Sequence, residues 1–238
     1  MFKEIAEIGV SLLFPKICET CSGVLPARSE ACVCSRCRSR MDKIRGPFCT
    51  GCGRTSAGQS LRCGQCGSGI PDLDGIYATF YYEGVTRELL QAYKFKDRKQ
   101  LKTVFVTAMK DFLSLHLDAS DFDGVVSVPM DAPKIRRRGF NQAQVFSSAV
   151  ARHTGKPDLS SSFARRISRR PQSLLNKTER AKNIAGSFFV KKPGMFAGKR
   201  MLLVDDILTT GFTASECART LKADGASSVT LLASARGR

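Results

Sequence analysis

Four pairs of cysteines, each separated by two residues, follow one another between positions 18 and 66 of this 238-residue chain. Two thiolates in such a turn converge on one tetrahedral ion, so two pairs complete a closed site with four sulfur ligands at about 2.3 Å from zinc. Eight ligands therefore predict two bound Zn²⁺ ions. The predicted ligands are Cys18, Cys21, Cys34, Cys37, Cys49, Cys52, Cys63 and Cys66.

The zinc ions are expected to be structural, because thiolates fill all four positions and leave none for a substrate. A segment this short, with few large apolar residues, also needs metal to fold. Sequential pairing gives two successive zinc ribbons, but the spacing alone also allows a cross-braced arrangement. Cys32, two residues before the second pair, is interpreted as a spare thiol. We predict a zinc-ribbon module over residues 1–70 and a second domain over residues 71–238.

No apolar stretch approaches the roughly 18–20 residues that a membrane-spanning helix needs. The first 18 residues also lack the features of a secretory signal, because Glu4 and Glu7 interrupt them and no small-residue cleavage site follows. Apolar residues between positions 2 and 13 recur instead at helical spacing, which predicts a short amphipathic helix. We therefore expect a cytoplasmic protein whose cysteines bind metal rather than form disulfides.

Beyond residue 70, apolar runs typical of strands alternate with amphipathic stretches typical of helices. This alternation predicts an α/β domain with a mostly parallel sheet and flanking helices. The expected strands are 76–82, 124–128, 201–204 and 229–233, and the expected helices are 84–95, 98–115, 140–153 and 213–224. Ligands of such sheets bind beyond the carboxyl ends of the strands, which directs attention to the segment after residue 204.

That segment combines two carboxylates, three threonines and a glycine within nine residues. A turn that enters a helix presents free N–H groups and the positive end of the helix dipole to an anion, and threonine hydroxyls add donors. The carboxylates can accept hydrogen bonds from sugar hydroxyls beside it. The alternative, a threonine cap and two solvated aspartates, explains only one threonine. The candidate phosphate and sugar ligands are Asp205, Asp206, Thr209, Thr210, Gly211, Phe212 and Thr213.

The sequence VDDILTTGFT at 204–213 resembles the phosphoribosyl pyrophosphate (PRPP) signature of type I phosphoribosyltransferases. With the cysteine pairs and the segments SVP (127–129), RRGFNQ (137–142) and RPQ (170–172), nearly the whole chain is similar to the ComF family, whose members are associated with DNA uptake in naturally competent bacteria. The resemblance implies a type I phosphoribosyltransferase-like α/β fold. It implies that Thr209–Thr213 hold the ribose 5-phosphate, that Asp205 and Asp206 hold the ribose hydroxyls, and that Mg²⁺ accompanies the pyrophosphate.

One departure limits what the resemblance implies about the acceptor. Thr209 stands where purine-salvage relatives often place an acid that serves as base toward the purine, so the acceptor nucleophile stays unidentified. We expect no glutaminase domain within these 238 residues, so an amidotransferase reaction would need another source of ammonia.

The charge of the chain favours an anionic ligand. It has 38 Lys and Arg against 21 Asp and Glu, a formal net charge of +17. Two Zn²⁺ with eight thiolates bring residues 1–70 to about +1. Residues 134–182, here called the basic belt, hold 13 basic side chains and two acidic ones. We expect its first part, residues 134–138, to form a loop near the pyrophosphate, and its part from Arg165 onward to form a mobile flap over the substrate.

Three functional hypotheses follow. In the first, an enzyme transfers phosphoribose from PRPP, and Arg137 and Arg138 are the catalytic residues that neutralise the leaving pyrophosphate. In the second, the phosphoribose pocket and the basic belt hold single-stranded DNA during transformation. In the third, the zinc module recruits a competence helicase while the second domain senses PRPP.

Overall fold

The structure is a computed structural model that describes residues 15–26, 29, 31–56, 63, 66–67, 69–96, 98–166 and 184–238. The amphipathic helix expected before residue 14 and residues 167–183 of the basic belt lie outside these described residues. No helix within the described ranges has both the length and the apolar character needed to span a membrane.

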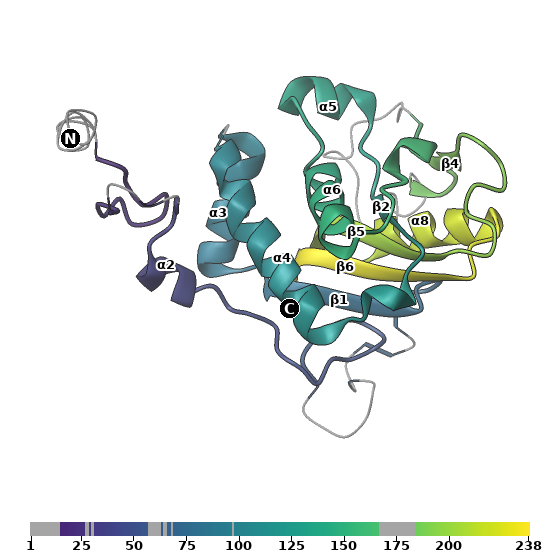
Figure 1. Cartoon of the computed structure of the whole chain (residues 1–238), viewed down its shortest axis with the longest axis horizontal. Coiled ribbons are helices and arrows are strands. Elements are labelled where there is room, and N and C mark those ends of the chain that lie inside the picture. The colour runs from purple at the N-terminus through teal and green to yellow at the C-terminus, as the bar shows by residue number, and fades with distance from the viewer. Residues whose placement is uncertain are drawn as a thin grey trace.

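A four-stranded parallel sheet forms the centre of the second domain (Figure 1). Its strands are β1 (Gly75–Tyr81), β2 (Gly124–Ser127), β5 (Arg200–Leu208) and β6 (Ser228–Arg236), in the order β1-β6-β5-β2. All three pairings are parallel, as the alternating pattern predicts. β5 extends four residues beyond the expected end, since its pairing with β6 continues from Asp205↔Ala233 to Leu208↔Arg236.

Helices cover both faces of this sheet. The long helices are α3 (Gly84–Phe95), α4 (Lys102–His116), α6 (Gln142–Thr154) and α8 (Phe212–Ala223), and short 3-10 turns occur at Lys99–Leu101, Ala119–Asp121 and Ser160–Ser162. Side chains along a strand alternate between faces. Leu202 and Val204 accordingly pack with α3, α4 and α6, whereas Met201 and Leu203 pack with α8. Because both faces are buried, the strands read as continuous apolar runs.

Three short elements in and beside the basic belt differ from expectation. Residues 132–138 form a helix, α5 (Ala132–Arg138), instead of the expected loop. The Asp131 carboxylate accepts the Lys134 N–H at 3.0 Å as the N-cap, and Gly139 ends the helix with a φ of +84°. Farther on, β3 (Phe163–Arg165) and β4 (Phe188–Val190) pair as a two-stranded antiparallel sheet on either side of residues 167–183.

The cysteine-rich segment is attached to the sheet domain at several points. α2 (Ser35–Ser39) lies on the α3 side of the molecule (Figure 1), where Gln100 Nε2 donates to Glu19 Oε1 at 2.8 Å. Between the two cysteine clusters the chain runs antiparallel to β1. The Ile44 N–H donates to the Thr79 carbonyl at 3.0 Å, and the Tyr81 N–H donates to the Asp42 carbonyl at 2.9 Å. The linker between the clusters thus adds to the edge of the sheet.

Candidate functional site

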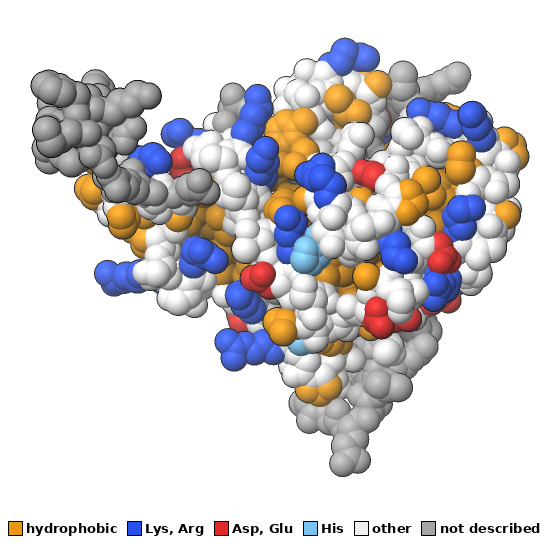
Figure 2. Space-filling model, viewed as in Figure 1, with side chains coloured by type: hydrophobic (Ala, Val, Ile, Leu, Met, Phe, Trp, Pro, Cys, Tyr) orange, Lys and Arg blue, Asp and Glu red, His pale blue; other side chains and the backbone are white. Residues whose placement is uncertain are grey.

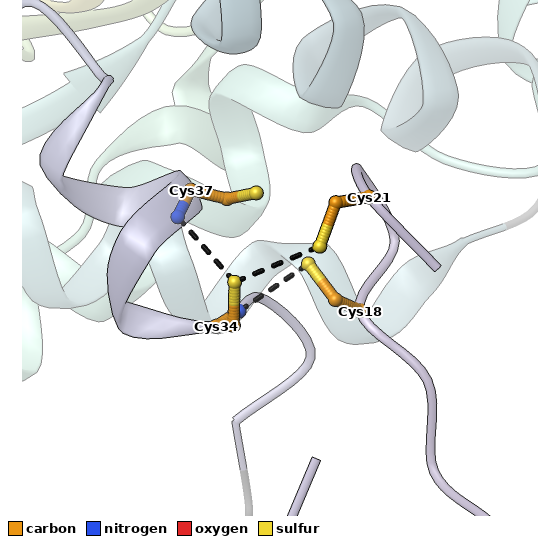
Figure 3. Close-up of side chains that lie close together, drawn as sticks. All are labelled: Cys18, Cys21, Cys34 and Cys37. Carbon is orange, nitrogen blue, oxygen red and sulfur yellow. Dashed lines mark hydrogen bonds between the residues drawn. The ribbon is translucent and has the colours of Figure 1, made fainter. Parts of the chain in front are cut away.

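The first cysteine cluster has the geometry of a tetrahedral metal site (Figure 3). The sulfurs of Cys18, Cys21, Cys34 and Cys37 lie within 4.8 Å of one another, and those of Cys21 and Cys34 are 3.8 Å apart. Metal–sulfur bonds of about 2.3 Å in a tetrahedron place sulfurs about 3.8 Å apart. Backbone N–H groups also point at the sulfurs, from Cys34 to Cys18 at 3.3 Å and from Cys37 to Cys34 at 3.4 Å. Such hydrogen bonds stabilise thiolate ligands.

The four thiols of this cluster need a cation before all of them can ionise. Burial opposes ionisation of Cys18, but N–H groups of Cys21 and Cys34 outweigh it and lower the pKa of Cys18 to about 6. Burial and the neighbouring sulfurs raise the pKa of Cys37 to about 12. A divalent ion at the centre of the cluster supplies the missing positive charge.

The second cluster repeats this arrangement. Its ligands Cys49, Cys52, Cys63 and Cys66 also lie within 4.8 Å of one another, with sulfur separations of 3.5 Å for Cys49–Cys66 and for Cys52–Cys63. The pairing is therefore sequential, which decides between the two arrangements that the spacing allowed. Both clusters are consistent with structural zinc sites. Cys32 belongs to neither and donates its thiol to the Gln100 carbonyl at 3.6 Å, as expected for a spare thiol.

The threonine-rich turn forms an open helix N-terminus. β5 ends at Leu208, Thr209 and Thr210 are exposed, and α8 begins at Phe212. The N-cap residue is Gly211, with a φ of +84°, so no side chain caps α8. The alternative of a threonine cap is therefore wrong. N–H groups of the first helical turn stay available to an anion, and the helix dipole favours negative charge there.

Ile70 covers this turn from the cysteine-rich side, a contact that sequence analysis missed. A Cβ built on Gly211 would lie 2.5 Å from Ile70 Cδ1. Only a glycine fits between this side chain and the turn. No sequence pattern indicates the contact, because the two residues are 141 positions apart and belong to different predicted domains.

The two predicted sugar ligands point in different directions. Asp205 and Asp206 are successive residues within β5, so their side chains lie on opposite faces of the sheet. Asp206 lies on the α3 side, where Lys94 Nζ is 2.7 Å from its Oδ2 atom. Burial and the Asp206 carboxylate raise the pKa of Asp205 to about 8, although the Asp206 N–H donates to Asp205 Oδ1 at 2.8 Å.

A basic cavity of about 490 Å³ opens at the end of α3, beside Lys94. Lys94 both lines this cavity and pairs with Asp206, and the aromatic rings of Tyr93, Phe95 and Phe140 form part of the wall. The candidate catalytic residues Arg137 and Arg138 line the same cavity. Arg138 is held in place, with its Nη1 atom donating to Gln142 Oε1 at 2.9 Å and its guanidinium carbon 4.9 Å from the Phe95 ring centre.

Lys94 and two of the aromatic residues of this cavity are functional candidates that sequence analysis missed. These three residues, Tyr93, Lys94 and Phe95, are consecutive at the end of α3. The signal was a Tyr-Lys-Phe-Lys run in which aromatic and basic residues alternate, but it lies about 110 residues from Asp206, which Lys94 contacts.

Comparison with known proteins gives two matching family descriptions. The phosphoribosyl transferase domain matches residues 135–238, and the double zinc ribbon domain matches residues 9–67. Competence protein F of Haemophilus influenzae is 26% identical, and the match covers 92% of this chain and 96% of that protein. Competence protein ComFC of Bacillus subtilis is 29% identical, over 85% of this chain and 84% of that protein. DNA utilization protein YhgH of Salmonella typhimurium is 28% identical, over 92% of this chain and 96% of that protein.

Among solved structures, the glutamine PRPP amidotransferase from B. subtilis complexed with ADP and GMP is 17% identical, with a TM-score of 0.41. The match covers 60% of this chain and 30% of that one.

Proposed function

Because this chain belongs to the ComF family, in which a double zinc ribbon precedes a phosphoribosyltransferase domain, we propose that it binds PRPP with Mg²⁺ at the end of β5. The observation that carries the proposal is the N-terminus of α8, where Gly211 leaves the helix without a side-chain cap directly after two carboxylates and two threonines. The expected relation to DNA uptake rests on the names of the relatives.

Each part of the site has a distinct task in this proposal. The backbone N–H groups and hydroxyls of residues 209–213 bind the 5-phosphate. Asp206 accepts hydrogen bonds from ribose hydroxyls after Lys94 has moved aside, and Asp205 does so in its ionised form. Arg137 and Arg138 stabilise the negative charge of the pyrophosphate as it leaves the anomeric carbon. Bound Mg²⁺ would supply further charge neutralisation to the pyrophosphate.

Calorimetric titration with PRPP in the presence of Mg²⁺ tests this proposal. The wild type should bind, and the double substitution Asp205→Asn and Asp206→Asn should weaken binding at least about tenfold, as expected for two lost charged hydrogen bonds. The control removes two carboxylates from exposed positions of α3 and α4, by Glu88→Gln with Asp111→Asn, and should bind like the wild type. A wild type that binds no PRPP would overturn the proposal.

A second candidate function is the binding of single-stranded DNA without transfer. It is favoured by a cavity of about 930 Å³ between the cluster linker, β1 and α4, which is lined by the basic residues Arg38, Arg40, Lys43, Arg45 and Arg238. Figure 2 also shows Lys and Arg side chains spread over the visible face. If the chain binds single-stranded DNA, a thymidine oligonucleotide should bind with an affinity that falls as salt concentration rises, and the double substitution Arg40→Ala with Lys43→Ala should weaken this binding. If the chain transfers phosphoribose, PRPP should instead release pyrophosphate.

The location and protein partner belong to the same proposal. A cytoplasmic location would keep the eight cluster thiols reduced and able to bind zinc. A competence helicase is the proposed partner of the zinc ribbons. Co-purification of that helicase with the wild type, lost when Cys49 and Cys52 are replaced, would support the partner assignment.

A further inference from the structure

We propose that the second zinc ribbon holds the phosphate-binding turn in its binding conformation through Ile70, so that zinc bound by the second cluster and phosphoribose bound at the turn stabilise each other. The inference rests on the proposed phosphoribose site and adds a regulating element to it. Ile70 is a positioning residue here, since it contacts the turn and not the ligand.

The contact between Ile70 and the turn is close. Three atoms of the Ile70 side chain, Cδ1, Cγ1 and Cγ2, lie 2.5, 2.8 and 2.9 Å from the position that a Cβ of Gly211 would occupy. The Ile70 side chain therefore packs directly on the α-carbon of the glycine. The φ of +84° at Gly211 directs the chain from β5 into α8, so a shift of Ile70 removes the surface on which this bend rests.

Ile70 is tied equally closely to the second cluster. Its N–H donates to the Gly51 carbonyl at 3.1 Å, and Gly51 lies between the ligands Cys49 and Cys52. The N–H of the preceding Gly69 donates to the carbonyl of the ligand Cys66 at 3.0 Å. The backbones of Gly51 and Gly69 approach so closely that a Cβ on Gly69 would lie 2.9 Å from the Gly51 oxygen. Metal ligands and Ile70 thus form one packed unit.

A second contact reaches the other end of the turn. Arg236, which is 4% exposed, lies close enough to the ligand Cys52 for its positive charge to attract the Cys52 thiolate. Arg236 pairs with Leu208 in the sheet, and the next N–H, from Gly237, donates to the Leu208 carbonyl at 2.9 Å. Leu208 is the last residue of β5 before the threonines. The ribbon therefore contacts the turn through Gly211 and, by way of β6, through Leu208.

The first cluster offers a natural comparison. Glu19, next to the ligand Cys18, contacts Gln100 and Arg98 of the sheet domain. These two residues follow the C-terminal end of α3, whereas β1 precedes its N-terminal end. No described contact joins the first cluster to residues 208–213. Loss of metal from the second cluster should therefore disturb the turn, while loss from the first cluster should leave it unchanged.

Hydrogen exchange tests the contact without any ligand. In the zinc-loaded full chain, the amide of Ser215, which donates to the Gly211 carbonyl at 2.8 Å, and the next amides of α8 should exchange at least about fivefold faster in Ile70→Ala and in Cys63→Ser than in the wild type, the lower limit expected for coupled sites. The matched controls are Ile44→Ala, which makes the same truncation at a buried residue paired with Thr79, and Cys21→Ser in the first cluster. Unchanged exchange of the turn in both test variants would overturn the inference.

Zinc release tests the reciprocal effect. Saturating PRPP with Mg²⁺ should slow zinc transfer from the second cluster to a chromogenic chelator at least about fivefold in Cys21→Ser, which leaves the second cluster as the zinc source. The same ligand should have no such effect when Ile70→Ala is added. Equal protection with and without Ile70 would contradict the inference. If the wild type binds no PRPP, the proposed function fails, while the exchange experiment still decides whether the ribbon holds the turn.

Discussion

Lys94 Nζ lies 2.7 Å from Asp206 Oδ2, and the two side chains are only 13 and 15% exposed. The pair joins the end of α3 to the carboxyl-terminal part of β5, and it connects the basic cavity to one of the two proposed sugar ligands. A lysine without this carboxylate, or a carboxylate without this lysine, would leave a charge unpaired in a mostly buried position.

We predict that Lys94→Met destabilises the chain by about 1–3 kcal/mol, since it leaves the Asp206 carboxylate without its cation. Urea unfolding measures this change. In a background of Asp206→Asn, the same substitution should cost less, because no unpaired charge remains. Equal costs in the two backgrounds would show that the pair contributes nothing to stability.

Asp205 should make stability depend on pH. Its pKa is raised to about 8 in the folded chain, whereas an unfolded aspartate titrates near 4. Between these values the native state binds more protons than the unfolded state, so the free energy of unfolding falls as pH rises from about 4 to about 8. In Asp205→Asn, position 205 carries no titratable group. The free energy of unfolding of this variant, relative to that of the wild type, should therefore increase from about pH 4 to about pH 8, by at most about 1.4 kcal/mol per pH unit.

Urea titrations at pH 5, 6, 7 and 8 measure this difference. Asp111→Asn at an exposed position of α4 removes one negative charge elsewhere and is the control. Parallel pH profiles for the wild type and Asp205→Asn would contradict the assignment of a raised pKa to Asp205.

Two glycines with the same backbone conformation allow the cost of backbone strain to be measured apart from the cost of a steric clash. Gly139 and Gly211 both have a φ of +84°, but a Cβ on Gly139 meets nothing within 4 Å, whereas one on Gly211 meets Ile70. Gly139→Ala should cost about 1 kcal/mol of stability from the left-handed backbone alone. Gly211→Ala should cost clearly more, and adding Ile70→Ala should recover part of the difference. Thermal unfolding of the three variants decides the matter, and equal losses for both glycines would exclude the steric contribution.

Metal content should follow the cluster assignment. Elemental analysis of the purified wild type should find two zinc ions per chain, and Cys32→Ser should keep both, because Cys32 lies outside the clusters. Cys21→Ser or Cys63→Ser should each lose one ion or bind it much more weakly. A loss of zinc in Cys32→Ser would place that thiol among the ligands.

The sequence predicts those elements that depend on residues close together in the chain. The Cys-x-x-Cys turns identified both clusters, and apolar periodicity identified all four strands of the parallel sheet and the helices α3, α4, α6 and α8. The helix α5 was missed because five of its seven residues are charged or proline and give no apolar periodicity. Its signals were instead the cap residues Asp131 and Gly139.

The candidate site was predicted as two separate segments, Arg137–Arg138 and Asp205–Thr213, each recognised from its own residues. Asp205 to Thr213 form one segment, and their helix N-terminus is where the pattern placed it. The length of β5 was underestimated, since two aspartates are poor strand formers and only the pairing with β6 keeps them extended. Contacts from Lys94 and Ile70 depend on the tertiary fold, so no window of sequence contains them.

The order of strands has a consequence for how the chain is made. β6 lies between β1 and β5, although both are synthesised before it. While the ribosome is still producing residues 228–236, β1 is hydrogen-bonded only to the linker between the clusters, and β5 has only β2. The cysteine clusters, by contrast, use ligands that emerge within 49 residues of one another. Nascent chains can therefore bind zinc before the sheet is complete. The edges of β1 and β5 stay unpaired on the β6 side until β6 has been synthesised, and a chaperone that binds exposed strand edges would act in this period.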